Sequence, residues 1–173
     1  PGNPVPAMPS LEYFKEVVEF AKQYNIIVLH DAAYSEFYFK GNAPISFLAT
    51  PGAKEVGLEI NSLSKSFSLA GTRIAYIVGN AQLVEIMKQL KSNLDFGIFE
   101  PIQQVAALAL DNSEEITDEL RKTFSKRHKT LMEGLTSIGW EVAPSDGGMF
   151  VWAKYPYDIN CIDFAFKAIE QTG

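Results

Sequence analysis

Apolar residues in the first part of the chain recur at helical spacing and then form a short continuous run. The helical pattern predicts a helix that begins after Ser10 and ends near Asn25. The apolar run at 26–29 follows at once and is typical of a strand buried on both faces, with Asp31 at its C-terminal end. The helical positions are Leu11, Phe14, Val17, Val18 and Ala21.

Two more strands are predicted on either side of a serine-rich segment. Residues 57–61 form the second strand and residues 73–79 the third. Only seven residues separate Lys65 from Arg73, which is too few for the crossover helix that a parallel neighbour needs. We therefore expect the third strand to run antiparallel to the second, in a mixed sheet. Segments 1–9 and 41–55, which are rich in proline or glycine, are predicted to be loops.

The second half of the chain favours long helices and one hairpin. Asn112 and Glu115 have the spacing of a capping box at the start of a long charged helix. The predicted helices cover residues 81–94, 100–110 and about 112–137, and the predicted hairpin strands cover 140–143 and 149–153. Asn80 is expected to cap the first of these helices and Asn160 a final one. In the final helix we expect Ile162, Phe164, Ala165, Ala168 and Ile169 to pack.

The composition excludes several classes of function. Of the 173 residues, 47% are apolar and 21% are charged, which is the balance of a folded globular domain. A net charge of −6 argues against a broad nucleic-acid surface. No apolar run approaches the roughly 18 residues of a membrane span, and the single cysteine, Cys161, cannot form an internal disulfide. We therefore expect a cytoplasmic protein that enters no membrane and binds no nucleic acid.

The two histidines do not form a metal-ligand cluster with the single cysteine. His30 precedes Asp31 on the first strand, so its side chain is expected to point to the opposite face, and both a packing role and a link to Asp31 remain open. His128 lies in the long charged helix, and we expect it on a solvated face. No metal site is predicted.

Segment 62–73 carries most of the chemistry in the chain. It places the amine of Lys65, the hydroxyls of Ser62 and Ser64, and the guanidinium of Arg73 directly after a predicted strand. A lysine amine condenses with a carbonyl group to form a Schiff base when its surroundings favour the neutral amine. Arginine and hydroxyl groups hold anions. The alternative is a serine-rich loop with a solvated Lys65 and a structural Arg73.

Asp31 stands at a second position where a ligand is expected. Ligands of open α/β sheets bind outside the carboxyl ends of the strands, so Asp31 and segment 62–65 are expected to face one crevice. Asp31 is equally suited to an Asx turn, and Tyr34 is equally suited to aromatic packing. The residues alone leave both alternatives open.

Taken in order, these residues resemble a known signature. Asn3-Pro4, Asp31-Ala32-Ala33-Tyr34 and the pattern Ser-x-Ser-Lys-x5-Gly-x-Arg at 62–73 are similar to the class I/II aminotransferase family. Its members are pyridoxal-phosphate enzymes of the aspartate aminotransferase fold. The resemblance covers the whole chain. It departs at Val5-Pro6, where the family commonly has Thr-Gly, and this leaves the contacts on the substrate side open.

The resemblance implies an α/β fold with a three-layer α/β/α arrangement around a mixed sheet. Residues 1–124 are expected in the large, cofactor-binding domain, and residues 125–173 at the start of a smaller α+β C-terminal domain. The family's aromatic residue that stacks on the cofactor ring and its arginine for the substrate carboxylate have no counterpart here. We therefore expect a fragment of a longer protein, with little or no transaminase activity by itself.

The resemblance also implies a role for each matched residue. Lys65 would hold pyridoxal 5'-phosphate as a Schiff base, the internal aldimine, and then carry a proton between the substrate α-carbon and the cofactor. Asp31 would pair with the protonated pyridine nitrogen, and Asn3 and Tyr34 would hydrogen-bond the phenolic oxygen. The implied phosphate ligands are Ser62, Ser64 and Arg73, and the implied catalytic residues are Lys65, Asp31 and Tyr34.

The implied function is transfer of an amino group between an L-α-amino acid and a 2-oxo acid, by a homodimer. Two alternatives keep the same fold: a pyridoxal-phosphate-dependent β-lyase, and a non-catalytic aminotransferase-like sensor domain of a transcription regulator. A nucleotide-binding P-loop is excluded, because positions 59–64 hold no glycine before Lys65.

Overall fold

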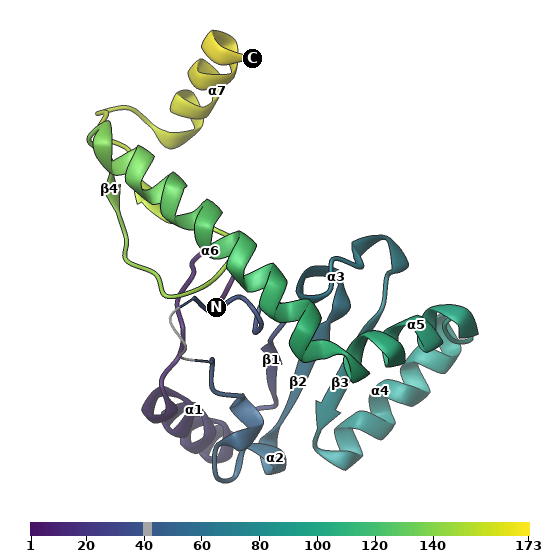
Figure 1. Ribbon diagram of the computed structural model, residues 1–173. Helices are drawn as coiled ribbons and strands as arrows, with labels where there is room; N and C mark the ends of the chain where they lie inside the picture. Colours follow the sequence, from purple (N-terminus) through teal and green to yellow (C-terminus); the bar gives the residue numbers. More distant parts are fainter. Residues whose placement is uncertain (40–42) are drawn as a thin grey trace.

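The computed structural model describes residues 1–39 and 43–173, and its centre is a three-stranded sheet (Figure 1). The strands are β1 (Val28–Asp31), β2 (Gly57–Ser62) and β3 (Ala75–Gly79), hydrogen-bonded in the order β1-β2-β3. β1 is parallel to β2, and β3 is antiparallel to β2. The predicted mixed sheet and the direction of the third strand are confirmed.

One layer of helices lies against the sheet face that carries His30. Helix α1 (Leu11–Tyr24) begins where the Ser10 hydroxyl accepts a hydrogen bond from the Tyr13 amide at 3.1 Å, as the sequence predicts. The short helices η1 (Phe47–Ala49) and α2 (Ala53–Val56) complete this layer. The buried residues that join the three helices are Phe14, Val18, Phe47 and Ala53.

A second layer of helices lies on the opposite side of the sheet (Figure 1). It contains α3 (Leu63–Ser66), η2 (Ala70–Thr72), α4 (Ala81–Leu94) and α5 (Glu100–Asp111). Its buried cluster consists of Leu63, Ile74, Ala106 and Ala109. The sheet therefore lies between two helical layers, which confirms the three-layer α/β prediction.

Helix α6 (Ser113–Ser137) connects this body to the C-terminal elements (Figure 1). The antiparallel pair β4 (Glu141–Val142) and β5 (Ala153–Lys154) confirms that a hairpin forms here, but of the predicted second strand 149–153 only residue 153 lies in β5. Helix α7 (Cys161–Thr172) follows. The ring of Phe164 stacks on that of Tyr155 at 4.7 Å. The predicted domain division between residues 124 and 125 falls inside the continuous helix α6 and stays a prediction.

The prediction that the first strand is buried on both faces was wrong. Residues 26 and 27 precede β1, and the Leu29 side chain within it is 60% exposed. β1 is an edge strand of this sheet, and α1 covers only the face of His30, where Phe14 contacts the imidazole ring at 5.2 Å. Leu29 points to the other face, so an apolar run did not imply burial here.

Two predictions about loops also need correction. Segment 41–55 was expected to be a loop, but η1 lies within it and α2 begins in it, while residues 41 and 42 lie outside the described residues. The alternative of a serine-rich loop at 62–73 also fails for residues 63–66, which form α3 with Ser62 as its cap. In both places a short helix is stabilised by one buried apolar side chain, Phe47 in η1 and Leu63 in α3.

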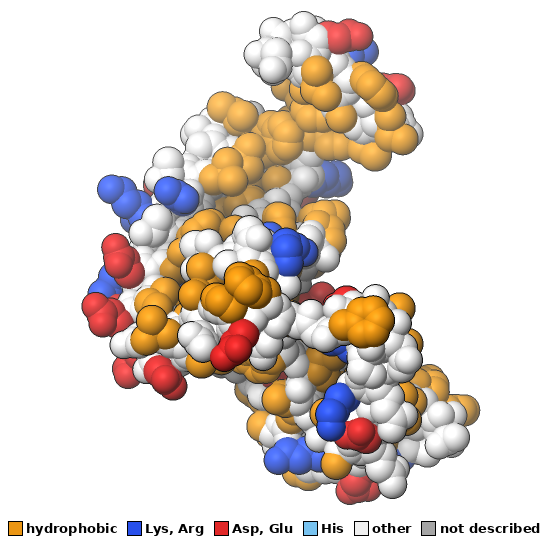
Figure 2. Space-filling view, turned by 90° about the vertical axis from the view of Figure 1, so that its right-hand side faces the viewer, with side chains coloured by type: hydrophobic (Ala, Val, Ile, Leu, Met, Phe, Trp, Pro, Cys, Tyr) orange, Lys and Arg blue, Asp and Glu red, His pale blue; other side chains and the backbone are white. Residues whose placement is uncertain are grey.

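Two predictions about the C-terminal helices were wrong. Asn112 does not cap α6 with its side chain, which instead donates a hydrogen bond to the Leu108 carbonyl at 2.8 Å. The apolar side of α7 is largely uncovered, with Ile162 61% and Ile169 64% exposed. Figure 2 shows hydrophobic side chains on the surface at the upper end of the molecule, where α7 lies.

Two backbone hydrogen bonds join segment 34–39 to the turn between β4 and β5. The Gly148 amide donates to the Phe37 carbonyl at 2.7 Å, and the Phe39 amide donates to the Asp146 carbonyl at 2.8 Å. A Cβ atom at Gly147 would lie 2.2 Å from the Phe37 carbonyl oxygen. Glycine is therefore required at 147 for the two backbones to approach this closely.

We expect Gly147→Ala to lower the free energy of unfolding by about 1–3 kcal/mol, because the added methyl group must push two backbones apart. Urea denaturation of the two proteins measures the difference. Gly134→Ala in α6 is the matched control. A Cβ atom there meets no neighbour within 4 Å, so this variant should be neutral or up to about 1 kcal/mol more stable. Equal stability of Gly147→Ala and the parent protein would contradict the prediction.

Candidate active site

The register of β1 and β2 brings two predicted site segments to the same edge of the sheet. Asp31, the last residue of β1, is paired with Ile60, and the Ala32 amide donates to the Ile60 carbonyl at 2.8 Å. β2 ends two residues later at Ser62, and α3 with Lys65 follows directly. Asp31 and Lys65 therefore both leave the carboxyl ends of neighbouring parallel strands, where ligands of α/β sheets bind.

Lys65 lies in the single helical turn of α3. The Ser62 hydroxyl accepts a hydrogen bond from the Ser64 amide at 3.2 Å and so starts the turn, while Leu63 is only 1% exposed and anchors it. Lys65 is half-buried. Within residues 1–39 and 43–173, its ammonium group makes neither a hydrogen bond nor an ion pair. The turn thus holds the backbone of Lys65 and leaves its amine without a protein partner.

Asp31 does form the Asx turn that the sequence left open. Its Oδ1 accepts a hydrogen bond from the Ala33 amide at 3.0 Å. The side chain is exposed, and no described residue donates to Oδ2. The structural role therefore uses one carboxylate oxygen and leaves the other available to a cationic or N–H group of a ligand.

Asn3 and Tyr34 meet although they are far apart in the sequence. The Asn3 amide donates to the Tyr34 hydroxyl at 3.2 Å. The Tyr34 ring also packs edge-on against Phe150 at 5.6 Å and lies 6.5 Å from the Phe37 ring. The aromatic packing that the sequence allowed is therefore present, and it holds a hydroxyl group that points to Asn3.

Arg73 follows η2 with a left-handed backbone, at φ 55°. Its guanidinium donates to the Ala70 carbonyl at 2.9 Å, and the side chain lines a cavity of about 560 Å³ together with Ile60 and Phe96. Asp31 lines a different cavity, of about 300 Å³. The structure thus brings Asn3 to Tyr34 and places Ser62, Ser64 and Lys65 on one turn, whereas Asp31 and Arg73 line two different cavities.

Glu59 is a functional candidate that sequence reasoning missed. Its side chain lies next to His30 across the β1–β2 pair, with the imidazole Nδ1 3.1 Å from Oε2. The Ser46 hydroxyl and the Phe47 amide donate to the same oxygen at 2.8 and 3.0 Å, and the Asn61 amide donates to Oε1 at 3.3 Å. Glu59 is 7% exposed, yet four groups surround its carboxylate. The only signal in the sequence is a charged residue between Leu58 and Ile60.

The hydrogen bonds decide the ionisation of Glu59. Burial by itself would raise the pKa of the Glu59 carboxyl, but hydrogen bonds from His30, Ser46 and Asn61 lower that pKa to about 2. Glu59 is therefore a carboxylate at neutral pH. His30 contacts Glu59 and the rings of Phe14 and Phe47, which agrees with a packing role and not with a link to Asp31.

His128 does not lie on the solvated face that the sequence had predicted. His128 is half-buried, and its ring lies 5.1 Å from the Phe39 ring. The expected solvated face was wrong, because segment 34–39 packs against this part of α6. Phe39 is far from His128 in the sequence, so helical periodicity alone gave no sign of the contact.

Comparison with known proteins decides the family. The profile of the family described as Aminotransferase class I and II matches residues 1–172. The chain belongs to this aminotransferase family. The LL-diaminopimelate aminotransferase of Halothermothrix orenii is 41% identical over 173 residues, which are 100% of this chain and 44% of that protein. The enzyme of the same name from Aquifex aeolicus is 39% identical and is covered to 45%. The chain thus spans less than half the length of these relatives.

Solved structures of known proteins share the fold of this chain. BacF from Bacillus subtilis with bound substrate superposes with a TM-score of 0.92 at 32% identity, over 98% of this chain and 44% of that one. A probable N-succinyldiaminopimelate aminotransferase from Thermus thermophilus superposes with a TM-score of 0.92 at 28% identity, over 99% of this chain and 46% of that one. In the described part of this aminotransferase chain, no helix is long and apolar enough to cross a membrane.

The low pKa of Glu59 predicts a pH dependence of stability. The carboxylate gains its hydrogen bonds only in the folded state, so its contribution is complete above the ordinary pKa of 4.5 and is lost as the pH falls towards 2. One pKa unit corresponds to about 1.4 kcal/mol, so the contribution is roughly 3 kcal/mol. We expect Glu59→Gln to be destabilised at pH 7 and to lose less stability than the parent protein between pH 4.5 and 2.

Urea denaturation across this pH range measures the effect. Glu55→Gln is the matched control, because Glu55 forms an ion pair with Lys22 at 2.7 Å but its side chain is 68% exposed. Such surface pairs contribute about 0–1 kcal/mol. If the two variants show the same stability at pH 7, the interpretation of Glu59 is wrong.

Proposed function

We propose that the full-length protein transfers an amino group between an L-α-amino acid and a 2-oxo acid, with pyridoxal 5'-phosphate as cofactor. The observation that carries the proposal is the placement of Lys65, with an amine that no described residue engages, on the turn that follows β2, beside the end of β1 with Asp31. Membership of the aminotransferase family supports it.

The donor set of the chain fits this cofactor. A pyridine nitrogen needs a carboxylate, and Asp31 has one oxygen without a protein donor. A phenolic oxygen needs N–H and O–H donors, and Asn3 and Tyr34 lie 3.2 Å apart. An aldehyde needs an amine, which Lys65 provides. The hydroxyls of Ser62 and Ser64 and the guanidinium of Arg73 are suited to a phosphate group.

Each residue then has a definite task. When bound, pyridoxal phosphate supplies a ring that withdraws electrons from the bonds of the substrate α-carbon. Asp31 keeps a proton on the ring nitrogen through a charge-assisted hydrogen bond. The Tyr34 hydroxyl and the Asn3 amide orient the ring through its oxygen. The Lys65 amine would take a proton from the substrate α-carbon as a general base and give it, as a general acid, to the carbon of the cofactor that carried the aldehyde.

We propose LL-diaminopimelate as the amino donor. The support is the set of curated relatives at about 40% identity, which are named LL-diaminopimelate aminotransferases. We further propose a cytoplasmic homodimer, with residues 1–124 in the cofactor-binding domain and residues 125–173 at the start of the smaller domain.

Lys65→Ala tests the central residue of this function. Without the amine, we expect the visible absorbance band of the cofactor-loaded full-length protein to disappear and amino transfer to fall by about 10²- to 10⁴-fold, the usual contribution of a general base. Lys129→Ala is the control, because that side chain is 75% exposed on α6 and should leave both properties unchanged. A parent protein without the band after incubation with the cofactor would refute the assignment.

A product assay separates the proposed reaction from its alternatives. Full-length protein is incubated with LL-diaminopimelate and a 2-oxo acid, and both amino transfer and the release of ammonia or thiol from amino acids are measured. We expect amino transfer that depends on the 2-oxo acid. Release of ammonia or thiol without it would favour the β-lyase. Cofactor binding without turnover of any amino acid tested would favour the sensor domain.

A further inference from the structure

Tyr34 lies in a tight turn that also carries Glu36. The Ser35 amide donates to the Ala32 carbonyl and the Phe37 amide donates to the Tyr34 carbonyl, both at 3.0 Å. Tyr34 and Glu36 therefore belong to one hydrogen-bonded turn. Beyond it, Phe37 is fully buried and packs edge-on against Phe124 of α6 at 5.0 Å.

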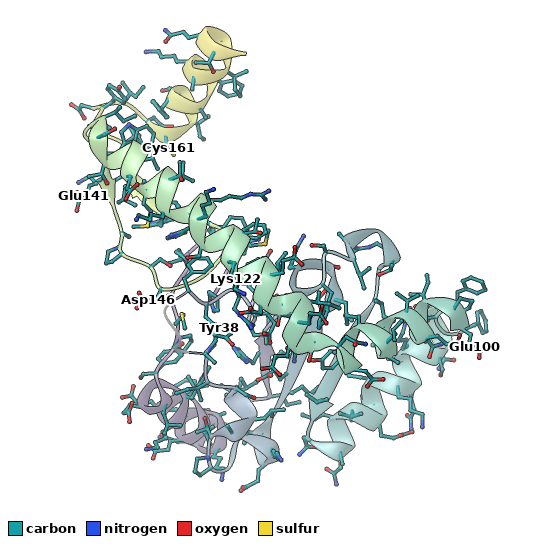
Figure 3. The ribbon with its side chains drawn as sticks, in the orientation of Figure 1. Tyr38, Glu100, Lys122, Glu141, Asp146 and Cys161 are labelled. Atoms are coloured by element: carbon teal, nitrogen blue, oxygen red, sulfur yellow. The ribbon has the colours of Figure 1, made fainter. Side chains whose placement is uncertain are left out.

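Arg121 of α6 forms an ion pair with Glu36 in this turn. Its Nη1 donates to Glu36 Oε2 and to Thr117 Oγ1, each at 3.0 Å, and its guanidinium carbon lies 4.6 Å from the centre of the Tyr38 ring. The Arg121 side chain is only 15% exposed. Figure 3 shows Tyr38 close to the part of α6 that carries Lys122, with Asp146 nearby. We call the group of Arg121, Glu36 and Tyr38 the Arg121 clamp.

The negative charge of Glu36 lies close to other carboxyl groups and requires a cation such as Arg121 beside it. Glu36 lines the cavity of about 300 Å³ together with Asp31 and Glu59, so three carboxyl side chains border one small space. Burial raises the pKa of the nearby Tyr76 hydroxyl, and the negative charges of Glu36 and Glu59 raise it further. Without a cation on Glu36, its negative charge would border the same cavity as those of Glu59 and Asp31 with no opposite charge to offset their repulsion.

We propose that Arg121 is a positioning residue for Tyr34: by neutralising and holding Glu36, the Arg121 clamp fixes the turn that presents the Tyr34 hydroxyl to Asn3 and to the bound cofactor. The part that concerns the cofactor rests on the proposed function. Among the described residues, Arg121 forms no hydrogen bond, ion pair or ring contact with Tyr34 or Asn3, so it acts through the turn.

The first test uses hydrogen exchange of the full-length protein without cofactor. In Arg121→Gln and in Glu36→Gln, the amides of Ser35 and Phe37 should exchange about tenfold faster, since one hydrogen bond to a charged group no longer opposes opening of the turn. Arg121→Lys, which keeps the charge, should restore part of the protection. Lys129→Gln is the matched control, because Lys129 pairs with Glu133 on the same helix and its side chain is 75% exposed.

The second test uses the cofactor-loaded protein and the pH midpoint of its visible absorbance band. A hydrogen bond from Tyr34 stabilises the deprotonated phenolic oxygen, so Tyr34→Phe should move the midpoint upward. Arg121→Gln should move it in the same direction by about half a pH unit, and should add no further shift in the Tyr34→Phe background, because both changes remove the same contact.

Each outcome decides a separate point. Unchanged exchange of the Ser35 and Phe37 amides in both Arg121→Gln and Glu36→Gln would overturn the clamp. An equal shift of the midpoint from Arg121→Gln with and without the Tyr34 hydroxyl would show that Arg121 does not act through Tyr34, and would overturn the positioning role. A parent protein with no cofactor band would refute the proposed function, and the exchange result would then decide the clamp alone.

Discussion

The pairing of β1 with β2 is the constraint on which the candidate site depends. His30 faces Glu59 across this pair, and the buried carboxylate also accepts hydrogen bonds from Ser46 and Phe47. A slip of one residue would turn Glu59 to the opposite face, away from its donors, and would leave a buried charge unpaired. The same register sets Asp31 beside Ile60, two residues before β2 ends. The hydrogen bonds around Glu59 therefore fix the strand register, and the register fixes the position of the Asp31 carboxylate relative to Lys65.

Packing from distant parts of the chain completes the arrangement. Segment 34–39 lies between α6 and the turn at 146–148, and the hydroxyl of Tyr34 at its start meets Asn3 from the beginning of the chain. Because α6 continues to the C-terminal elements, the proposed boundary between the two domains lies within four residues of Arg121.

Features that depend on neighbours in the sequence could be predicted, and features that depend on distant partners could not. The cap at Ser10 and the antiparallel third strand follow from local residue types and from the short connection before Arg73. The ordered residues from Asn3 to Arg73 were sufficient to indicate the family. The role of Glu59 escaped notice because its partner His30 lies 29 positions away. The exposure of Leu29 was missed because periodicity does not show that a strand is at the edge of a sheet.

The position of the covalent attachment tests the account most directly. The full-length protein is loaded with pyridoxal phosphate, reduced with borohydride, digested with trypsin and analysed by mass spectrometry. Trypsin does not cleave after a modified lysine, so we expect one peptide that spans residues 55–73 and carries the reduced cofactor on Lys65. The cofactor on a different lysine, with separate unmodified peptides 55–65 and 66–73, would contradict the account.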